Sequence, residues 1–302
     1  MKPAHIGLAV FVAAIWGVNF VVIHWGLRDF PPLFMVAARF MLVALFAFFL
    51  PRPRWSWRRL VFIGLAWFAG QFGFLFTAMA AGMPAGLASV TLQSQAFFTI
   101  LMAAVLLGER PDVRQLAGSG AALTGLLIIG TTAGTDGFTL AGLMLTLAAA
   151  VSWAAGNVLL RSSGGANMLA VVVWLSLVPP LPLLALSLII EGPHAIVTAL
   201  TSVSWAGIAS LAYIVIGSTL VGFGIWGHLI KLYPVSTVAP FALLVPVFGT
   251  LAAIMLLGER FPAQRLAGVA LIVAGLAIVA LPARWLRAPW LGRKGCSGTS
   301  AS

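Results

Sequence analysis

The sequence predicts an all-α integral membrane protein, in which ten transmembrane helices form two inverted five-helix repeats. Three observations predict this fold class. Of the 302 residues, 62% are hydrophobic and only 8% are charged, whereas soluble domains carry about 25% charged residues. Ten apolar runs follow one another along the chain, each near the ~20 residues that cross a bilayer core. The pentapeptide LLGER occurs twice, at residues 106–110 and 256–260.

Proline, glycine and charged clusters separate the ten runs, as PRPRWSWRR does at residues 51–59 and GMPAG at 82–86. The first run is too long for a cleaved signal peptide and contains Asn19, so we interpret it as a span. In chain order, the predicted spans are residues 6–26, 33–50, 60–81, 86–107, 115–131, 138–160, 168–190, 203–226, 236–257 and 266–283.

The placement of lysine and arginine predicts the orientation, because short cytoplasmic loops are enriched in both. With a cytoplasmic N-terminus, Arg28, Arg260 and Arg265 lie outside, Arg39 lies within a span, and the other thirteen of the 17 cations lie inside. Both termini are therefore predicted to be cytoplasmic. The membrane topology and contact with membrane lipid therefore explain the net charge of +11. The same distribution argues against nucleic acid as a partner.

The two copies of LLGER begin a longer internal repeat. Residues 106–130 and 256–280 are identical at eleven of 25 aligned positions, and Trp16 with Asn19 is echoed by Trp153 with Asn157. Five spans are an odd number, so a second copy enters the membrane upside down. Inverted repeats place a substrate site where the halves meet and provide alternating access. We therefore predict repeats at residues 1–132 and 133–284 and a basic cytoplasmic tail at 285–302; a duplicated scaffold or channel is the alternative.

We interpret LLGER itself as a structural motif, a turn that fixes the hairpin between two helices. Glu109 falls at the C-terminal end of span four, where the helix dipole disfavours a carboxylate. The start of the next helix, or Arg110 and Arg114, is expected to hold it. Glu259 is expected to use Arg260 and Arg265 in the same way. Gly108 and Gly258 complete the two turns, and a role of the glutamates in energy coupling is the alternative.

Polar and aromatic side chains inside the spans are the candidates for a substrate site, because buried polarity in a membrane usually faces a cavity or another helix. For the amides, the alternative is a hydrogen bond between helices. For the indoles it is core packing, and for the arginine it is snorkelling towards the outer surface or bonding to carbonyls of a neighbouring helix. The candidates are Trp16, Asn19, Arg39, Gln71, Gln95, Trp153, Asn157, Trp174 and Tyr213.

The six acids all lie in loops or at span ends, so the sequence lacks a carboxylate relay at the membrane midplane. We therefore predict downhill facilitated transport, with proton-coupled multidrug or metabolite efflux, or a channel, as alternatives.

The sequence contains no HExxH or GxSxG motif and no cysteine–histidine cluster. No enzyme activity, cofactor or metal is expected. The expected partners are a small-molecule substrate and lipid, and the sequence leaves open a monomer or a homodimer.

These features together resemble the EamA family of the drug/metabolite transporter superfamily. The resemblance rests on W-G-x-N-F at residues 16–20, the five-plus-five duplication, and L-G-E closing spans four and nine. It covers about residues 5–283. It implies ten helices, a central cavity and export of small metabolites through a bacterial inner membrane. Within this family, the chain also resembles the branch that exports amino acids, including aromatic ones.

The family often has proline midway along span four. Here that position is Ala96 while span nine has Pro246, so the two spans are not expected to bend alike.

Overall fold

The computed structural model describes residues 1–160 and 167–280, and every regular element in them is helical. Ten helices are long and apolar enough to cross a membrane, so the predicted all-α class and span count are confirmed. Nine predicted spans begin and end within a few residues of the observed ones. The eighth continues to Leu232 because the first proline after it is Pro234. The predicted tail at 285–302, with Cys296, lies outside the described residues.

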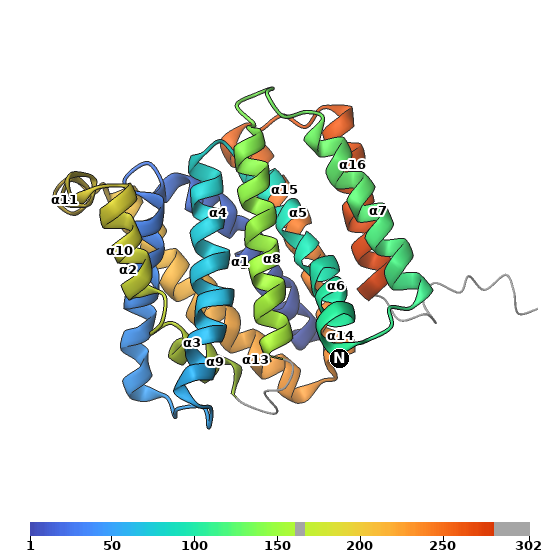
Figure 1. Cartoon of the computed structure of the whole chain (residues 1–302), viewed down its shortest axis with the longest axis horizontal. Helices are drawn as coiled ribbons and strands as arrows, with labels where there is room; N and C mark the ends of the chain where they lie inside the picture. The colour runs from blue at the N-terminus through green and yellow to red at the C-terminus, as the bar shows by residue number, and fades with distance from the viewer. Residues whose placement is uncertain (161–166, 281–302) are drawn as a thin grey trace, which may run out of the picture.

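The first five spans alternate in direction across the membrane (Figure 1). Span three and span four each change helix type along their length. The elements are α1 (Pro3–Gly26), α2 (Pro32–Ala44) with η1 (Leu45–Phe49), α3 (Trp57–Ile63) with η2 (Gly64–Gly70) and α4 (Gln71–Ala80), α5 (Ala85–Thr91) with η3 (Leu92–Ser94) and α6 (Gln95–Leu107), and α7 (Val113–Gly130).

The second five spans follow after the loop at residues 131–139, with two additional short helices, α11 and α14, outside the spans. Their elements are α8 (Leu140–Leu160), α9 (Met168–Leu175) with α10 (Pro180–Ile190), the extra helix α11 (Pro193–Thr201), α12 (Trp205–Ala212) with η4 (Tyr213–Val221) and α13 (Gly222–Leu232), α14 (Val235–Val238), η5 (Ala239–Leu243) with α15 (Leu244–Leu257), and α16 (Ala263–Ala280).

The membrane ends of the spans define two faces of the molecule. We call one the Glu259 face; the opposite one, with the N-terminus, is the Glu109 face (Figure 1). Since each span reverses direction, the Glu259 face carries the connections at residues 27–31, 81–84, 131–139, 191–204 and 258–262.

Irregular helix occurs at matching places in the two halves. The π-helical segments η2 and η4 lie in spans three and eight, and the 3-10 segments η3 and η5 lie in spans four and nine. Each pair is separated by about the same 150 residues that separate the two LLGER copies. Gly108 and Gly258 both end their helices with φ of 67°, a left-handed conformation that glycine adopts without strain. Spans four and nine therefore both contain a 3-10 segment, although span four has Ala96 at the position where span nine has Pro246.

Helices α7 and α16 pack closely against each other along their length. A Cβ atom on Gly118 would stand 2.6 Å from the carbonyl oxygen of Gly275, and one on Gly125 would stand 2.6 Å from that of Gly268. Such closeness needs residues without side chains. The contacts are reciprocal in register, because Gly268 and Gly275 lie 150 residues after Gly118 and Gly125.

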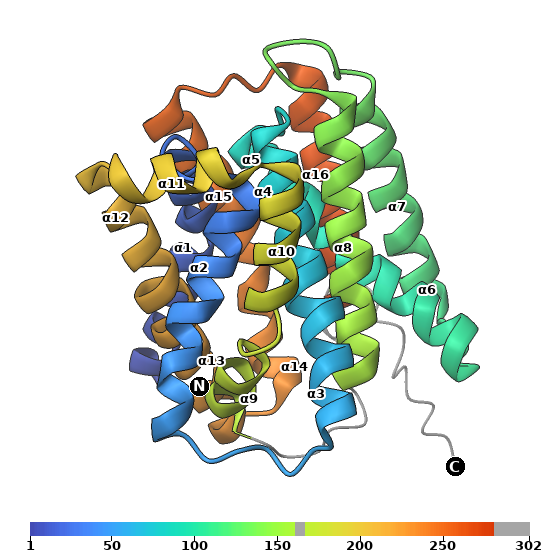
Figure 2. The same cartoon turned by 60° about the vertical axis from the view of Figure 1, so that its left-hand side comes forward.

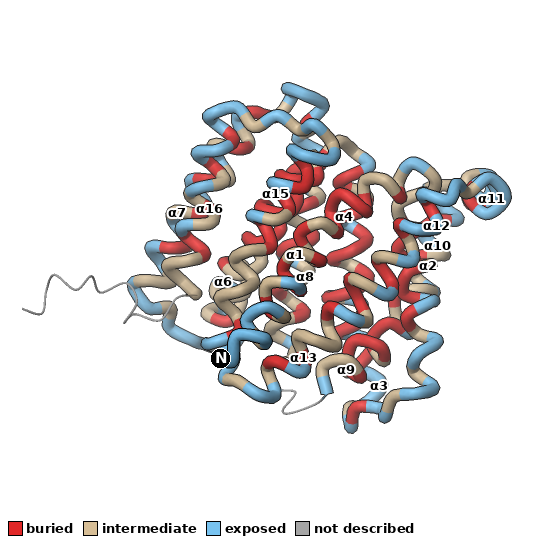
Figure 3. The backbone as a smooth tube through the Cα atoms, turned by 180° about the vertical axis from the view of Figure 1, so that it is seen from behind, coloured by how far each residue is buried: buried red, intermediate tan, exposed pale blue. Residues whose placement is uncertain are grey.

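Buried residues concentrate where α1, α4, α5 and α15 meet, while α7, α16 and α11 are mostly intermediate or exposed (Figure 3). Helix α11 lies across the Glu259 face, at a steep angle to the spans (Figure 2). It begins with Pro193 and buries Ile196 and Ala199 while exposing Val197 and Leu200. The sequence analysis did not predict α11, because nine amphipathic residues are too short for a span.

Candidate transport site and gate

Arg39 is the charged residue at the centre of the candidate site. Its side chain is buried, at 2% exposure, inside α2. Its Nη2 and Nε donate to the hydroxyl of Thr219 at 2.9 and 3.3 Å, and its guanidinium lies 4.2 Å from the ring centre of Phe72. The side chain therefore neither snorkels to the surface nor bonds to a carbonyl, the two alternatives from the sequence. It joins span two to spans three and eight.

The positive charge of Arg39 has no carboxylate partner. The six acids of the chain lie outside the ten spans, and the Nη1 atom of Arg39 lacks a hydrogen-bond partner. A buried charge left in this state is costly unless a ligand or water completes it. Thr219, which the sequence analysis did not select, sits in the π-helical segment, and its hydroxyl donates to the Ile214 carbonyl five residues earlier.

Two amides also carry unpartnered buried atoms. The side-chain oxygens of Asn19 in α1 and Gln71 in α4 are buried without a hydrogen-bond partner. Gln71 directly precedes Phe72, whose ring packs on Arg39. Both atoms are acceptors, whereas the free Arg39 Nη1 is a donor. The described parts of the spans therefore contain one cationic donor and two amide oxygens without a partner, besides the hydroxyl oxygens of Thr91, Ser94 and Thr250.

Asn157 and Gln95 form a separate polar pair. The Asn157 amide nitrogen donates to the Gln95 side-chain oxygen at 2.8 Å and to the Thr99 hydroxyl at 3.2 Å. All three side chains are half-buried. The structure thus brings these two predicted residues together as a link between spans six and four, the alternative that the sequence analysis gave for the amides.

Aromatic rings from both halves form a continuous row. Trp67 contacts Phe223 with ring centres 6.3 Å apart, Phe223 contacts Trp16 at 5.2 Å, and Trp16 contacts Trp226 at 5.3 Å. The indole of Trp16 also donates to the Ser218 carbonyl at 3.0 Å. Apart from the buried Trp67, the rings are half-buried. Phe223 and Trp226 were not predicted, since an apolar span marks no individual ring.

Three further predicted residues lie elsewhere. The Tyr213 hydroxyl donates to the Ile15 carbonyl at 2.9 Å and so ties span eight to span one. Trp153 is half-buried and packs on the hydrophobic core. Trp174, predicted to belong to the substrate site inside the spans, instead donates to the Leu50 carbonyl at 3.0 Å and neighbours Trp57, so it stands at the Glu109 face.

Glu259 caps a helix of the other half. Its two carboxylate oxygens accept the backbone N–H groups of Ala85 at 2.6 Å and Gly86 at 3.0 Å, at the start of α5. A carboxylate at this end of a helix meets unpaired donors and a favourable dipole. Burial raises the pKa of the Glu259 carboxyl above its ordinary value, and the two N–H groups and the charge of Arg265 offset only part of that rise.

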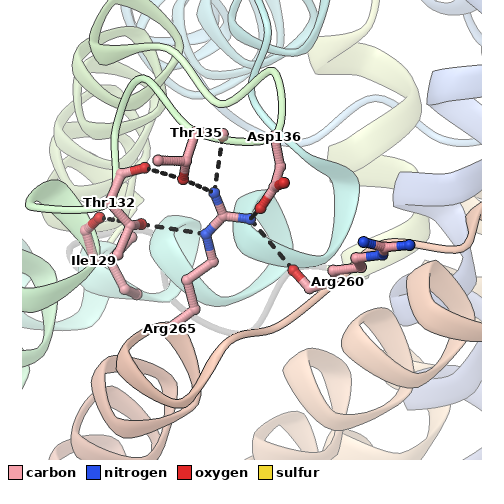
Figure 4. Close-up of polar contacts among 6 residues, drawn as sticks. All are labelled: Ile129, Thr132, Thr135, Asp136, Arg260 and Arg265. Atoms are coloured by element: carbon pink, nitrogen blue, oxygen red, sulfur yellow. Dashed lines mark hydrogen bonds and ion pairs between the residues drawn. The ribbon is translucent and has the colours of Figure 1, made fainter.

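Arg265 serves a different partner from the one expected. Its guanidinium makes an ion pair with Asp136 at 3.3 Å and donates to the hydroxyls of Thr132 and Thr135, and to the Arg260 carbonyl (Figure 4). The hydrogen bonds to Glu259 thus come from backbone N–H groups and not from the expected Arg260 and Arg265, although the charge of Arg265 still acts favourably on this carboxylate. A cavity of about 310 Å³ lies beside this cluster, between Pro84 and Leu257 on the Glu259 face.

Two more acids join the halves on the Glu259 face. Glu191 accepts the N–H groups of Leu33 at 2.7 Å and Phe34 at 3.2 Å, at the start of α2. Asp29 accepts the hydroxyl of Ser204, which caps α12. Together with Glu259 and Asp136, four of the six acids thus lie on this face.

Comparison with known proteins decides the family. The model of the EamA-like transporter family matches residues 4–131 and, separately, residues 140–281. The chain belongs to the EamA-like transporter family. A "Probable amino-acid metabolite efflux pump" of Salmonella typhimurium is 45% identical over 90% of this chain and 93% of its own. A protein of the same name from Escherichia coli is 43% identical over 94% and 97%.

Two more distant similarities agree with the fold of this EamA-like transporter. A "Probable terminal-alkyne amino-acid exporter" of Streptantibioticus cattleyicolor is 30% identical over 65% of this chain and 64% of its own. A solved structure titled "Crystal structure of protein" superposes with a TM-score of 0.62 at 22% identity, covering 95% of this chain and 100% of the other. The predicted family and the prediction of a multi-pass membrane transporter are thereby confirmed. Family membership indicates transport rather than catalysis.

Proposed function

We propose that this EamA-like transporter exports amino acids and similar zwitterionic metabolites from the cytoplasm by alternating access. The observation that carries the proposal is that Arg39 Nη1 and the side-chain oxygens of Asn19 and Gln71 are buried inside the spans without a hydrogen-bond partner. An amino acid brings a carboxylate, which the free Nη1 of Arg39 suits. It also brings an ammonium group, which the unpartnered oxygens of Asn19 and Gln71 suit. The names of the similar proteins support the same substrate class.

The row of rings supports larger side chains among the substrates. Trp16, Phe223 and Trp226 are half-buried and lie in spans one and eight. Aromatic faces bind apolar and ring-bearing groups through burial and ring contacts. We therefore favour phenylalanine-like and branched substrates over phosphorylated ones, because a phosphate needs several buried cations, and Arg39 is the one cation that the sequence places midway along a span.

Two inverted repeats, residues 1–132 and 133–284, are the proposed machinery. The family model matches each half separately. The π-helical segments and the reciprocal glycine contacts of α7 and α16 follow one register of 150 residues. These observations support a two-fold axis in the membrane plane, which is the symmetry used for alternating access. The Glu109 face carries most loop cations, so we place it and both termini in the cytoplasm of a bacterium, at its inner membrane.

Facilitated movement down the substrate gradient is the proposed mode of energy use. All six acids lie outside the spans, whereas a proton relay would need acids inside them. Proton coupling stays the second candidate because one specific carboxyl, Glu259, is half-buried with a raised pKa.

Counterflow in liposomes tests the proposal. The purified protein is reconstituted with internal phenylalanine or threonine, and entry of the labelled amino acid is measured with and without a pH gradient at fixed voltage. We expect saturable counterflow that ignores the gradient and falls at least tenfold for the amino-acid amide, which lacks the carboxylate. Equal counterflow of the amide would contradict the role of Arg39. Dependence on the gradient that disappears in Glu259→Gln would favour proton coupling.

A further inference from the structure

The hydroxyl group of Thr219 is fully used by two partners from different parts of the molecule. Thr219 is buried in the π-helical segment η4 of span eight. Its oxygen accepts from Nη2 and Nε of Arg39 at 2.9 and 3.3 Å, and its hydrogen is donated to the Ile214 carbonyl at 2.8 Å. A hydroxyl offers one hydrogen and two lone pairs, so Thr219 has no capacity left for a substrate. Any role of Thr219 in the site is therefore exercised through Arg39.

Thr219 occupies one of the two forks of the Arg39 guanidinium. The N–H groups of arginine form one fork at the side, from Nε and Nη2, and a second fork at the end, from Nη1 and Nη2. Thr219 takes the side fork. Within the part of the chain that the structure describes, the Nη1 atom is buried without a hydrogen-bond partner. The end fork is therefore the one that can bind both oxygens of a carboxylate.

Two phenylalanine rings restrain the face of the same guanidinium. Its central carbon lies 4.2 Å from the ring centre of Phe72 and 5.1 Å from that of Phe40. A cation is attracted to a ring by the charge distribution above the ring face. This attraction fixes where the guanidinium lies but does not select which fork meets which partner. The hydrogen bonds to Thr219 make that selection.

The segment that carries Thr219 is itself held against the first half. The indole of Trp16, in span one, donates to the carbonyl of the neighbouring Ser218 at 3.0 Å. Arg39, in span two, binds the next residue along the same segment. The π-helical turn places the Thr219 hydroxyl on the carbonyl five residues earlier. Consecutive residues of span eight therefore hold the charge of Arg39 and the first ring of the aromatic row.

We propose that Thr219 is the positioning residue of the carboxylate site. By holding the side fork of Arg39, it reserves the end fork for the substrate. A carboxylate has two coplanar oxygens that match this fork, whereas the corresponding amide has one. The inference deepens the function proposed above and rests on it, because it requires a substrate with a carboxylate. Without the hydroxyl, the side fork loses its acceptor and the end fork is no longer held in one direction.

Counterflow kinetics of Thr219→Val test the positioning role, because valine keeps the branched shape of threonine without the hydroxyl. We expect the KM for phenylalanine to rise about tenfold, as the loss of hydrogen bonds to a charged group predicts. The maximal rate should change by less than about twofold, because the hydroxyl acts on binding. The preference for phenylalanine over its amide should fall by a factor similar to the rise in KM. Thr219→Ala should behave in the same way, and Thr219→Ser, which keeps the hydroxyl, should restore both values.

Two further variants separate positioning from a loss of structure. Thr146→Val is the matched control. Thr146 is also fully buried in a span and donates to the Gly142 carbonyl of its own helix at 2.8 Å, but among the described residues it bonds to no charged group. Its substitution should leave the KM and the preference unchanged. In an Arg39→Met background, Thr219→Val should lower counterflow no further, because the group that it positions is already absent.

The possible outcomes distinguish this inference from the proposed function. An unchanged KM in folded Thr219→Val, a loss confined to the maximal rate, or no recovery in Thr219→Ser would overturn the positioning role. A further loss of counterflow in the Arg39→Met background would overturn it as well. In each of these cases the wild type still prefers phenylalanine to its amide. Equal counterflow of the two compounds by the wild type would overturn the carboxylate substrate, and the positioning role with it.

Discussion

Asn157 donates a hydrogen bond of 2.8 Å to the side-chain oxygen of Gln95, and this bond joins span six to span four. Polar bonds between membrane helices average about 0.6 kcal/mol in double-mutant cycles. We expect Asn157→Ala and Gln95→Ala each to lower the free energy of unfolding by about 1 kcal/mol. The double variant should lose about 0.6 kcal/mol less than the sum, because the bond is lost only once. Unfolding in detergent measures this, and strict additivity would show that the pair does not couple.

The guanidinium of Arg39 is expected to select substrates by their carboxylate. Arg39→Met removes the charge but keeps much of the stem that packs on Phe72. Counterflow of an amino acid should fall at least tenfold, and its preference over the amide should disappear. Arg39→Lys keeps a charge without the planar fork that binds a carboxylate in two places, so it should recover part of the preference. A preference unchanged in Arg39→Met would place the carboxylate elsewhere.

The raised pKa of Glu259 predicts how stability depends on pH. A carboxyl whose pKa is higher in the folded protein than in the unfolded chain binds its proton more readily when folded. Its contribution to stability therefore improves as pH falls through the folded pKa towards the ordinary value, and worsens as pH rises. We expect the melting temperature of the wild type to rise relative to that of Glu259→Gln as pH falls from 7 to about 4.5. A constant difference between the two proteins over this range would contradict the prediction.

The contact between α7 and α16 predicts opposite effects of two similar substitutions. Gly118→Ala places a Cβ atom 2.6 Å from the Gly275 carbonyl oxygen, and such overpacking costs about 1–3 kcal/mol. Gly120 lies on the same helix, with nothing within 4 Å of an added Cβ. Gly120→Ala should therefore stabilise by up to about 1 kcal/mol through helix propensity. Thermal unfolding of both variants tests this, and equal effects would show that the helices separate without cost.

Hydropathy and charge were sufficient to predict the ten spans, because a bilayer requires long apolar segments wherever the chain crosses it. The sequence could not indicate which helices become neighbours. Glu259 was expected to pair with nearby arginines, yet its donors lie more than 170 positions earlier in the chain. Thr219 likewise meets Arg39 from a distant span. The depth of Trp174 in the membrane could not be predicted either. Span seven is broken between α9 and α10, so the number of residues between Trp174 and the nearest loop does not fix its depth.

The matched π-helical segments have a consequence for the history of the chain. A π-helical turn holds one more residue between its bonded groups than an α-helical turn does, which is the result expected when a residue is inserted into a finished helix. Both halves carry such a turn in the third helix, at the same distance from LLGER. One insertion in a single ancestral five-helix unit accounts for both, whereas two separate insertions would have to coincide in position. With the two repeats proposed above, the irregular turn would therefore be older than the duplication that gave rise to them.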